Sequence, residues 1–125
     1  MSNAAGRRQK ILDGIFQAAE LAKRNPADIQ LIAVSKGRTA EEIEEIIAAG
    51  QRDFGENYAQ ELQAKAESLR DLEGLRWHFI GRLQLNKVRF VAGLASVVHT
   101  VDREELVREL DKRASAAGRR LDVLV

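Results

Sequence analysis

The chain has no cysteine and only one proline, and it has no long apolar run. Without cysteine it can form no disulfide, no thiolate metal site and no cysteine nucleophile. None of its apolar runs approaches the roughly 18–20 residues that a membrane span requires, and its N-terminus shows no signal-peptide core. We therefore expect a cytoplasmic protein that does not act in a membrane.

An excess of one charge is also absent, because 20 basic side chains face 19 acidic ones and the formal net charge is +1. This balance gives no electrostatic argument for nucleic acid or an anionic membrane as a partner. Hydrophobic residues make up 45% of the chain and charged residues 31%, as in ordinary globular proteins. A length of 125 residues suffices for one domain with a hydrophobic core.

The first residues are set apart from the rest. Met1-Ser2-Asn3-Ala4 reads like the remnant of an expression tag. We therefore expect residues 1–6 to be a tag-like or disordered start and residues 7–125 to form a single domain.

Strand and helix patterns alternate along the remaining chain. A helical face at 7–24 ends before Pro26, and an apolar, β-branched run follows at 29–34. Further strand patterns recur with starts roughly 20–24 residues apart. The predicted strands are 29–34, 53–56, 76–80, 96–101 and 121–125. The predicted helices that follow the first four strands are 39–50, 58–69, 83–91 and 102–118. Such repeated βα units form a parallel sheet with right-handed crossovers.

Two of these helices begin with capping signals. Thr39 and Glu42 have the spacing of a capping box, and Asp102 with Glu105 forms a plausible N-cap pair. Gly50 suits the C-terminal cap of the first of these helices.

The βα repeats leave two architectures open, a closed barrel and an open doubly wound sheet. A complete (β/α)8 barrel needs about 200–250 residues, so this chain would hold about half of one. In that case its five strands are the N-terminal part of a TIM-type barrel that follows an N-terminal helix. A sheet left open in this way exposes edges and apolar faces, which predicts a homo-oligomer formed through the open half-barrel. The alternative is a small open sheet with an ordinary edge strand.

In both architectures a ligand binds at the carboxyl ends of the strands. The candidate residues there are Ser35, Lys36, Glu56, Asn57, Ile80, Gly81, Arg82, Thr100, Val101 and Asp102. Among these residues Lys36 indicates the most specific chemistry. Partial desolvation at the end of an apolar strand favours its neutral amine, which is the form that attacks an aldehyde. The alternative is an ordinary solvated lysine at a strand end.

The other polar residues support fewer roles. Asn57 can hydrogen-bond a ligand or cap a helix, and these roles are compatible. We interpret Glu56 as a carboxylate paired with Arg or Lys rather than as a base. His78 and His99 lie in strands without the carboxylate cluster or third imidazole of a metal site, so we interpret them as core residues.

Four separated blocks of the chain resemble one protein family. The blocks are Ala33-Val34-Ser35-Lys36, then Phe54-Gly55-Glu56-Asn57-Tyr58, then Trp77-His78-Phe79-Ile80-Gly81 with Leu83-Gln84 and Asn86-Lys87, then His99 to Asp102. In this order and spacing they resemble the pyridoxal 5′-phosphate (PLP) homeostasis protein family, which is related to the N-terminal barrel domain of alanine racemase. The resemblance covers essentially the whole chain after the tag-like start.

The resemblance implies a (β/α)8 barrel preceded by a helix, with Lys36 as the lysine that holds PLP as an imine. It also implies that Val34, Asn57 and Ile80 lie near the cofactor ring. The implied function is PLP binding in PLP homeostasis without turnover, so the chain is not expected to be an enzyme.

Two alternatives to this function stay open. One is a truncated or engineered half-barrel that self-associates and binds PLP weakly or not at all. The other is a PLP-dependent racemase-like enzyme, which would need a second acid/base opposite Lys36, and the only tyrosine is Tyr58.

The chain also departs from the family pattern. Family members are about twice as long, and their phosphate-binding loops lie in the later strands. Gly37 stands where threonine is common in the family, and Arg82 stands where proline is frequent. Because the phosphate of PLP supplies much of its binding energy at such loops, we expect PLP occupancy to be low in this chain.

Overall fold

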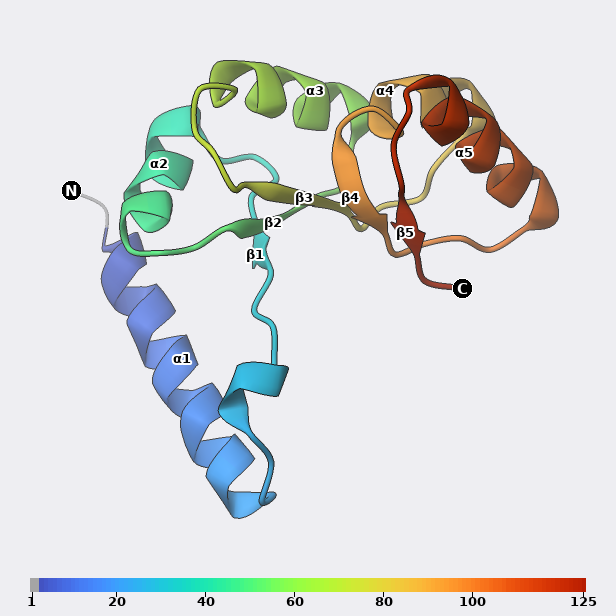
Figure 1. Cartoon of the computed structure of the whole chain (residues 1–125). Coiled ribbons are helices and arrows are strands. Elements are labelled where there is room, and N and C mark those ends of the chain that lie inside the picture. The colour runs from blue at the N-terminus through green and yellow to red at the C-terminus, as the bar shows by residue number, and fades with distance from the viewer. Residues whose placement is uncertain (1–2) are drawn as a thin grey trace.

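A computed structural model describes residues 3–125 and contains one five-stranded sheet with helices between its strands (Figure 1). The elements in chain order are α1 (Ala4–Leu21), the 3-10 helix η1 (Pro26–Asp28), β1 (Ala33–Val34), α2 (Ala40–Ala48), β2 (Asp53–Glu56), α3 (Ala59–Ser68), β3 (Arg76–Phe79), the 3-10 helix η2 (Leu85–Lys87), α4 (Val88–Val91), β4 (Ala95–Val98), α5 (Glu104–Ala116) and β5 (Asp122–Val123).

The strand order decides between the two architectures. The order is β1-β2-β3-β4-β5, and every neighbouring pair is parallel. A doubly wound sheet reverses its strand order at a switch point, whereas this sheet grows in one direction, as a barrel does. Helices α2 to α5 all lie along one side of the sheet (Figure 1). The fold is therefore α/β with parallel βα repeats, part of a TIM-type barrel.

The core lies between the sheet and these helices. Phe54, Trp77 and Phe79 point from β2 and β3 to the helical side, where they meet residues such as Leu62 of α3 and Leu106 of α5 in one buried cluster. The rings of Phe54 and Trp77 have centroids 5.6 Å apart. Because side chains alternate along a strand, the residues between these aromatics face the opposite side of the sheet.

The two outer strands are shorter than predicted. The expected strand 29–34 is the two-residue β1, and Val34 at its end is 52% exposed. The expected strand 121–125 is likewise the two-residue β5. Both strands lie at the edges of the sheet and pair on one side only, so periodicity alone overestimated their length.

Helix α1 begins earlier than predicted. It spans Ala4–Leu21 rather than 7–24, and therefore includes residues 4–6 of the expected tag-like start, while residues 1–2 lie outside the described residues. It packs against α2 and the following loop, where Arg8 donates to Gln51 Oε1 at 2.9 Å and to the Ala49 carbonyl at 2.8 Å. On its predicted apolar face Ala19 is buried, but Ile11 is exposed.

The capping predictions had different outcomes. The Thr39–Glu42 capping box is confirmed, because the Glu42 amide donates to Thr39 Oγ1 and the Thr39 amide donates back to the Glu42 carboxylate. Gly50 follows α2 with a φ of 108°, a conformation that glycine adopts without strain. The predicted Asp102 cap is wrong: the N-cap residue is Arg103, and Asp102 instead accepts from the Arg103 guanidinium at 2.7 Å.

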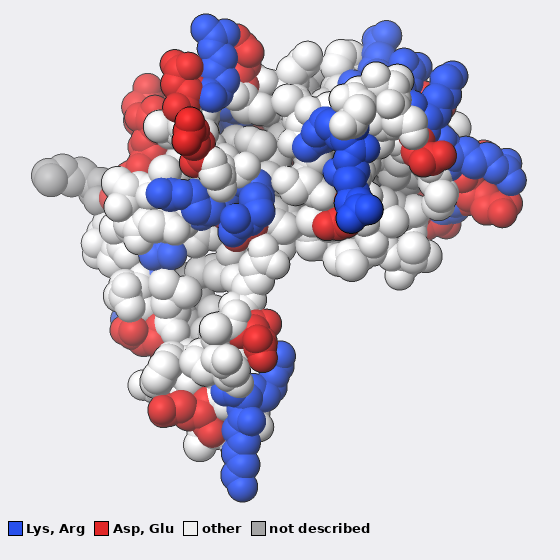
Figure 2. Space-filling model, in the orientation of Figure 1, with Lys and Arg blue, Asp and Glu red and all other residues white. Residues whose placement is uncertain are grey.

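The surface carries charges of both signs. Figure 2 shows Lys and Arg interspersed with Asp and Glu over the face in view. Several of these side chains form ion pairs within the same helix, such as Arg113 with Glu109 at 2.9 Å. Exposed pairs of this kind contribute less than about 1 kcal/mol each to the free energy of unfolding. None of the helices within residues 3–125 combines the length and the apolar character needed to cross a membrane.

Candidate functional site

The carboxyl ends of β1, β2 and β3 meet at one edge of the sheet. Val34 ends β1 and Lys36 lies two residues after it, while Asn57 and Ile80 directly follow β2 and β3. The parallel register aligns these ends, because Val34 pairs with Gly55 and Glu56 pairs with Phe79. The structure thus brings the four predicted site residues to the same edge.

An apolar surface lies beside this edge on the side of the sheet away from the helices. A Cβ atom on Gly55 would lie 3.0 Å from Ile80 Cδ1 and 3.3 Å from Ile32 Cγ2, so these two side chains approach each other over Gly55. Ala33 packs against the core, and therefore Val34 points to the same side as Ile32. A flat apolar group could rest on this surface.

Asn57 contacts the turn after β3 closely. A Cβ atom on Gly81 would lie 2.2 Å from the Asn57 carbonyl oxygen, so only glycine fits there. Asn57 Oδ1 is buried and has no hydrogen-bond partner among the described residues. The N-cap residue of α3 is Tyr58, so the interpretation of Asn57 as a helix cap is wrong. A buried acceptor without a partner is unusual and leaves Asn57 able to accept from a ligand.

Lys36 lies in the tight turn between β1 and α2. The Arg38 amide donates to the Ser35 carbonyl at 3.1 Å, and Gly37 has a φ of 71°, the left-handed conformation that favours glycine. The Lys36 side chain is exposed, and within residues 3–125 it makes no hydrogen bond or ion pair. The expected partial desolvation of Lys36 is therefore wrong, because β1 is an edge strand and its end is open to water.

A buried ionic group of Ser35, Glu56, Glu61 and Lys65, here called the Lys65 cluster, adjoins this turn. Glu56 is fully buried and Lys65 is 7% exposed. The Lys65 ammonium donates to Glu56 Oε1, to the Ser35 carbonyl and, at 2.8 Å, to Glu61 Oε1. The Ser35 hydroxyl donates to the same Glu56 oxygen at 2.8 Å. The interpretation of Glu56 as a carboxylate paired with a basic residue is confirmed.

Glu61 connects the Lys65 cluster to the other side of the turn. Its Oε1 accepts from the Gly37 amide at 2.5 Å. Hydrogen bonds from Lys65 and from Gly37 lower the pKa of Glu61 below its ordinary value of 4.5, against the opposing effect of burial. Sequence reasoning did not single out Lys65. The available signal was the spacing of Glu61 and Lys65, opposite charges four residues apart on a helix.

The histidines form a separate network within the sheet. His78 is buried, with Nε2 3.0 Å from Asp53 Oδ1 and Nδ1 2.9 Å from His99 Nε2. Burial raises the pKa of Asp53, but hydrogen bonds from Arg76 and His78 outweigh it and hold that pKa below its usual range. Burial and, secondarily, the charge of His78 lower the pKa of His99. The interpretation of His78 as a satisfied core residue is confirmed, and no group of three metal-ligating side chains exists within residues 3–125.

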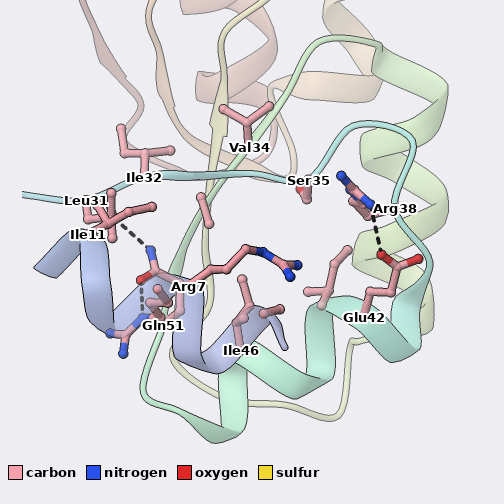
Figure 3. Close-up of a pocket in the computed structure, with 14 residues that line it drawn as sticks. Arg7, Ile11, Leu31, Ile32, Val34, Ser35, Arg38, Glu42, Ile46 and Gln51 are labelled. Atoms are coloured by element: carbon pink, nitrogen blue, oxygen red, sulfur yellow. Dashed lines mark hydrogen bonds and ion pairs between the residues drawn. The ribbon is translucent and has the colours of Figure 1, made fainter. Parts of the chain in front are cut away.

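A cavity of about 290 Å³ lies elsewhere, between α1, β1 and α2. Figure 3 shows the Arg7 side chain extending across it between the hydrophobic residues Ile11 and Ile46. Of the four predicted site residues only Val34 lines this cavity. Lys36, Asn57 and Ile80 therefore lie outside this cavity, and the candidate site is the edge of the sheet that carries Lys36.

Comparison with known proteins identifies sequence relatives of this chain. No protein-family model matches it. The pyridoxal phosphate homeostasis protein of Pseudomonas aeruginosa is 45% identical over 116 residues, which cover 93% of this chain and 50% of that protein. The protein of the same name from Escherichia coli K12 is 42% identical over 127 residues, covering 100% of this chain and 54% of that protein.

Solved structures agree with the sequence comparison. PipY of Synechococcus elongatus PCC7942, solved with PLP bound, is 43% identical with a TM-score of 0.76, covering 87% of this chain and 51% of that one. An unknown protein from Bifidobacterium adolescentis is 33% identical with a TM-score of 0.85, covering 99% of this chain and 56% of that one. The chain is therefore homologous to the pyridoxal phosphate homeostasis proteins, and it spans about half the length of the curated relatives that it matches.

Proposed function

We propose that this chain binds PLP as an imine on Lys36 and serves in PLP homeostasis. The observation that carries the proposal is the position of Lys36, an exposed lysine without a partner in residues 3–125, at the strand-end edge of a chain homologous to a protein solved with PLP bound. A relative's bound cofactor supports the ligand, and the position of the lysine supports the residue.

The site residues fit the chemistry that a pyridoxal aldehyde requires. The neutral Lys36 amine would attack the aldehyde carbon, and water would leave as the imine forms. Val34 and Ile80 offer an apolar surface for an aromatic ring, and the unpaired Asn57 Oδ1 can accept a hydrogen bond from the ligand.

We propose binding without turnover, as the names of the homologues suggest. A racemase-like enzyme would need a second acid/base facing Lys36. Tyr58 is 63% exposed and lines a groove with Asn57 and Gly81, whereas Lys36, Val34 and Ile80 do not line that groove. The racemase-like alternative therefore has less support than a carrier.

The test is a PLP titration followed by borohydride reduction and peptide mass mapping. We expect an adduct on Lys36 that is lost in Lys36→Ala and retained in Lys112→Ala, which removes another exposed lysine. Adducts spread evenly over the exposed lysines would refute the assignment. We also expect PLP to bind weakly. Imine absorbance at low micromolar PLP that disappears in Lys36→Ala would refute this expectation of weak binding.

We further propose that copies of the chain associate through the open half-barrel. The outer side of β1 has no partner strand within residues 3–125, and the exposed apolar residues include Val34, Val123 and Leu124. Association would cover such surfaces. Light scattering should show a dimer or larger species, and a stable monomer would contradict the proposal. The cytoplasmic location stays a prediction.

A further inference from the structure

The turn that carries Lys36 is anchored on both sides by the Lys65 cluster. On the near side, the Ser35 carbonyl accepts from the Lys65 ammonium and the Ser35 hydroxyl donates to Glu56. On the far side, the Gly37 amide donates to Glu61. Among residues 35–37, Lys36 alone makes no hydrogen bond or ion pair to the described part of the chain. The Lys65 cluster therefore holds the backbone of the turn and leaves the Lys36 amine unpaired there.

The anchors come from elements outside the turn. Glu56 ends β2, a strand paired on both sides, and Glu61 and Lys65 are one helical turn apart on α3. Glu56 and Lys65 are both buried, which is costly for charged groups, and an apolar pair of similar volume would stabilise a protein equally well. What an apolar pair could not provide is the directional hydrogen bonds that Glu56 and Lys65 make with Ser35.

The Lys65 cluster also distinguishes between two neighbouring lysines. The three donors of the Lys65 ammonium are directed to Ser35, Glu56 and Glu61. An ammonium held in this way has no lone pair to attack a carbonyl carbon. Lys36, in contrast, makes no hydrogen bond or ion pair within residues 3–125.

We propose that Lys65, held by Glu56 and Glu61, is a positioning residue for Lys36. It fixes the turn so that the Lys36 amine meets an aldehyde carbonyl at the strand-end edge, and its own ammonium stays unreactive. The proposal rests on the proposed function for the identity of the reactive lysine. Small misplacements of a reacting group can lower a rate by about 100-fold, so the loss of the anchors should be measurable.

The experiment compares Lys65→Met, and Lys65→Met combined with Glu56→Gln, with the parent chain. The double variant removes the ion pair of Lys65 and Glu56 without leaving a buried charge, which guards against simple unfolding. The matched control is Arg113→Met, which breaks the exposed pair of Arg113 with Glu109 on α5. Circular dichroism first establishes that each variant is folded.

The readout is the ratio of PLP adduct on Lys36 to adduct on Lys112 after brief exposure to PLP and cyanoborohydride, measured within the same molecules. We expect this ratio to fall by about 10-fold or more in both Lys65 variants and to stay unchanged in the control. An unchanged ratio in the folded double variant would overturn the proposal, because a cluster that serves stability alone would not affect the reactivity of a folded molecule.

Hydrogen exchange separates this inference from the proposed function. The Gly37 amide, protected by Glu61, should exchange at least about 10-fold faster when Lys65 is replaced, whether or not PLP reacts. If the parent chain forms no adduct on Lys36, the proposed function fails, while faster exchange still supports anchoring of the turn. Unchanged exchange in both Lys65 variants would overturn the anchoring itself.

Discussion

Replacing Lys65 by methionine should destabilise the fold far more than an ordinary surface substitution. The change leaves the Glu56 carboxylate fully buried without its cation. Glu56 Oε2 already lacks a hydrogen-bond partner in the described part of the chain, and Oε1 would keep only the Ser35 hydroxyl. Glu61 contributes less to the loss, because its side chain is 28% exposed and water can replace Lys65 there.

Removing one partner of a buried ion pair typically costs about 3–5 kcal/mol, so we expect the free energy of unfolding to fall by about that amount. A domain of this size has about 5–15 kcal/mol in total, and the variant would lose a large share of it. Combining Lys65→Met with Glu56→Gln removes the uncompensated charge and should recover most of the loss. The exposed pair of Arg113 and Glu109 provides the comparison, and Arg113→Met should cost less than about 1 kcal/mol.

The assay is urea unfolding followed by tryptophan fluorescence. Trp77 is the only tryptophan, and it is buried against Phe54, so its emission reports on the core directly. A loss in Lys65→Met no larger than that in Arg113→Met would refute the reasoning. So would a double variant that is less stable than the single one, since the buried charge of Glu56 would then not be the cause.

Three further predictions concern single contacts. Gly81→Ala places a Cβ atom 2.2 Å from the Asn57 carbonyl oxygen and should cost at least about 1–3 kcal/mol, seen as a lower Tm; an unchanged Tm would contradict the close approach. Thr39→Ala removes the capping box and should cost about 1 kcal/mol by urea unfolding, whereas Ser at this position should cost little. Because the pKa of Glu61 is lowered in the folded state, its contribution to the free energy of unfolding is present above pH 4.5 and is lost as the pH falls through the folded-state pKa. Glu61→Gln should therefore make the free energy of unfolding depend less on pH in the acid range. An unchanged pH dependence in that range would exclude this role.

Local patterns in the sequence were sufficient for the order of the elements. Strands β2 and β3 and the capping box at Thr39 depend on residues within a few positions of each other, so local patterns and spacing predicted them well. The edge strands β1 and β5 were predicted too long, because strand length there depends on whether a neighbour pairs along the whole run.

The candidate site was predictable in its location but not in its supporting residues. Topology alone placed Lys36, Asn57 and Ile80 at the carboxyl ends of neighbouring parallel strands, and the family resemblance added Val34. The partial desolvation expected for Lys36 was wrong, because exposure depends on what covers β1 in three dimensions.

The sequence by itself determined the βα repeat, the parallel sheet and a lysine at the end of the first strand, since each follows from the identity and spacing of neighbouring residues. The βα periodicity left the strand order open, and the three-dimensional packing gives the order of a barrel and brings Lys65 against the Lys36 turn. Lys65 is distant from Ser35 in the chain, and the two meet only because α3 packs beside the ends of β1 and β2. Hydrogen bonds between such distant segments depend on packing, which no local pattern of residues records.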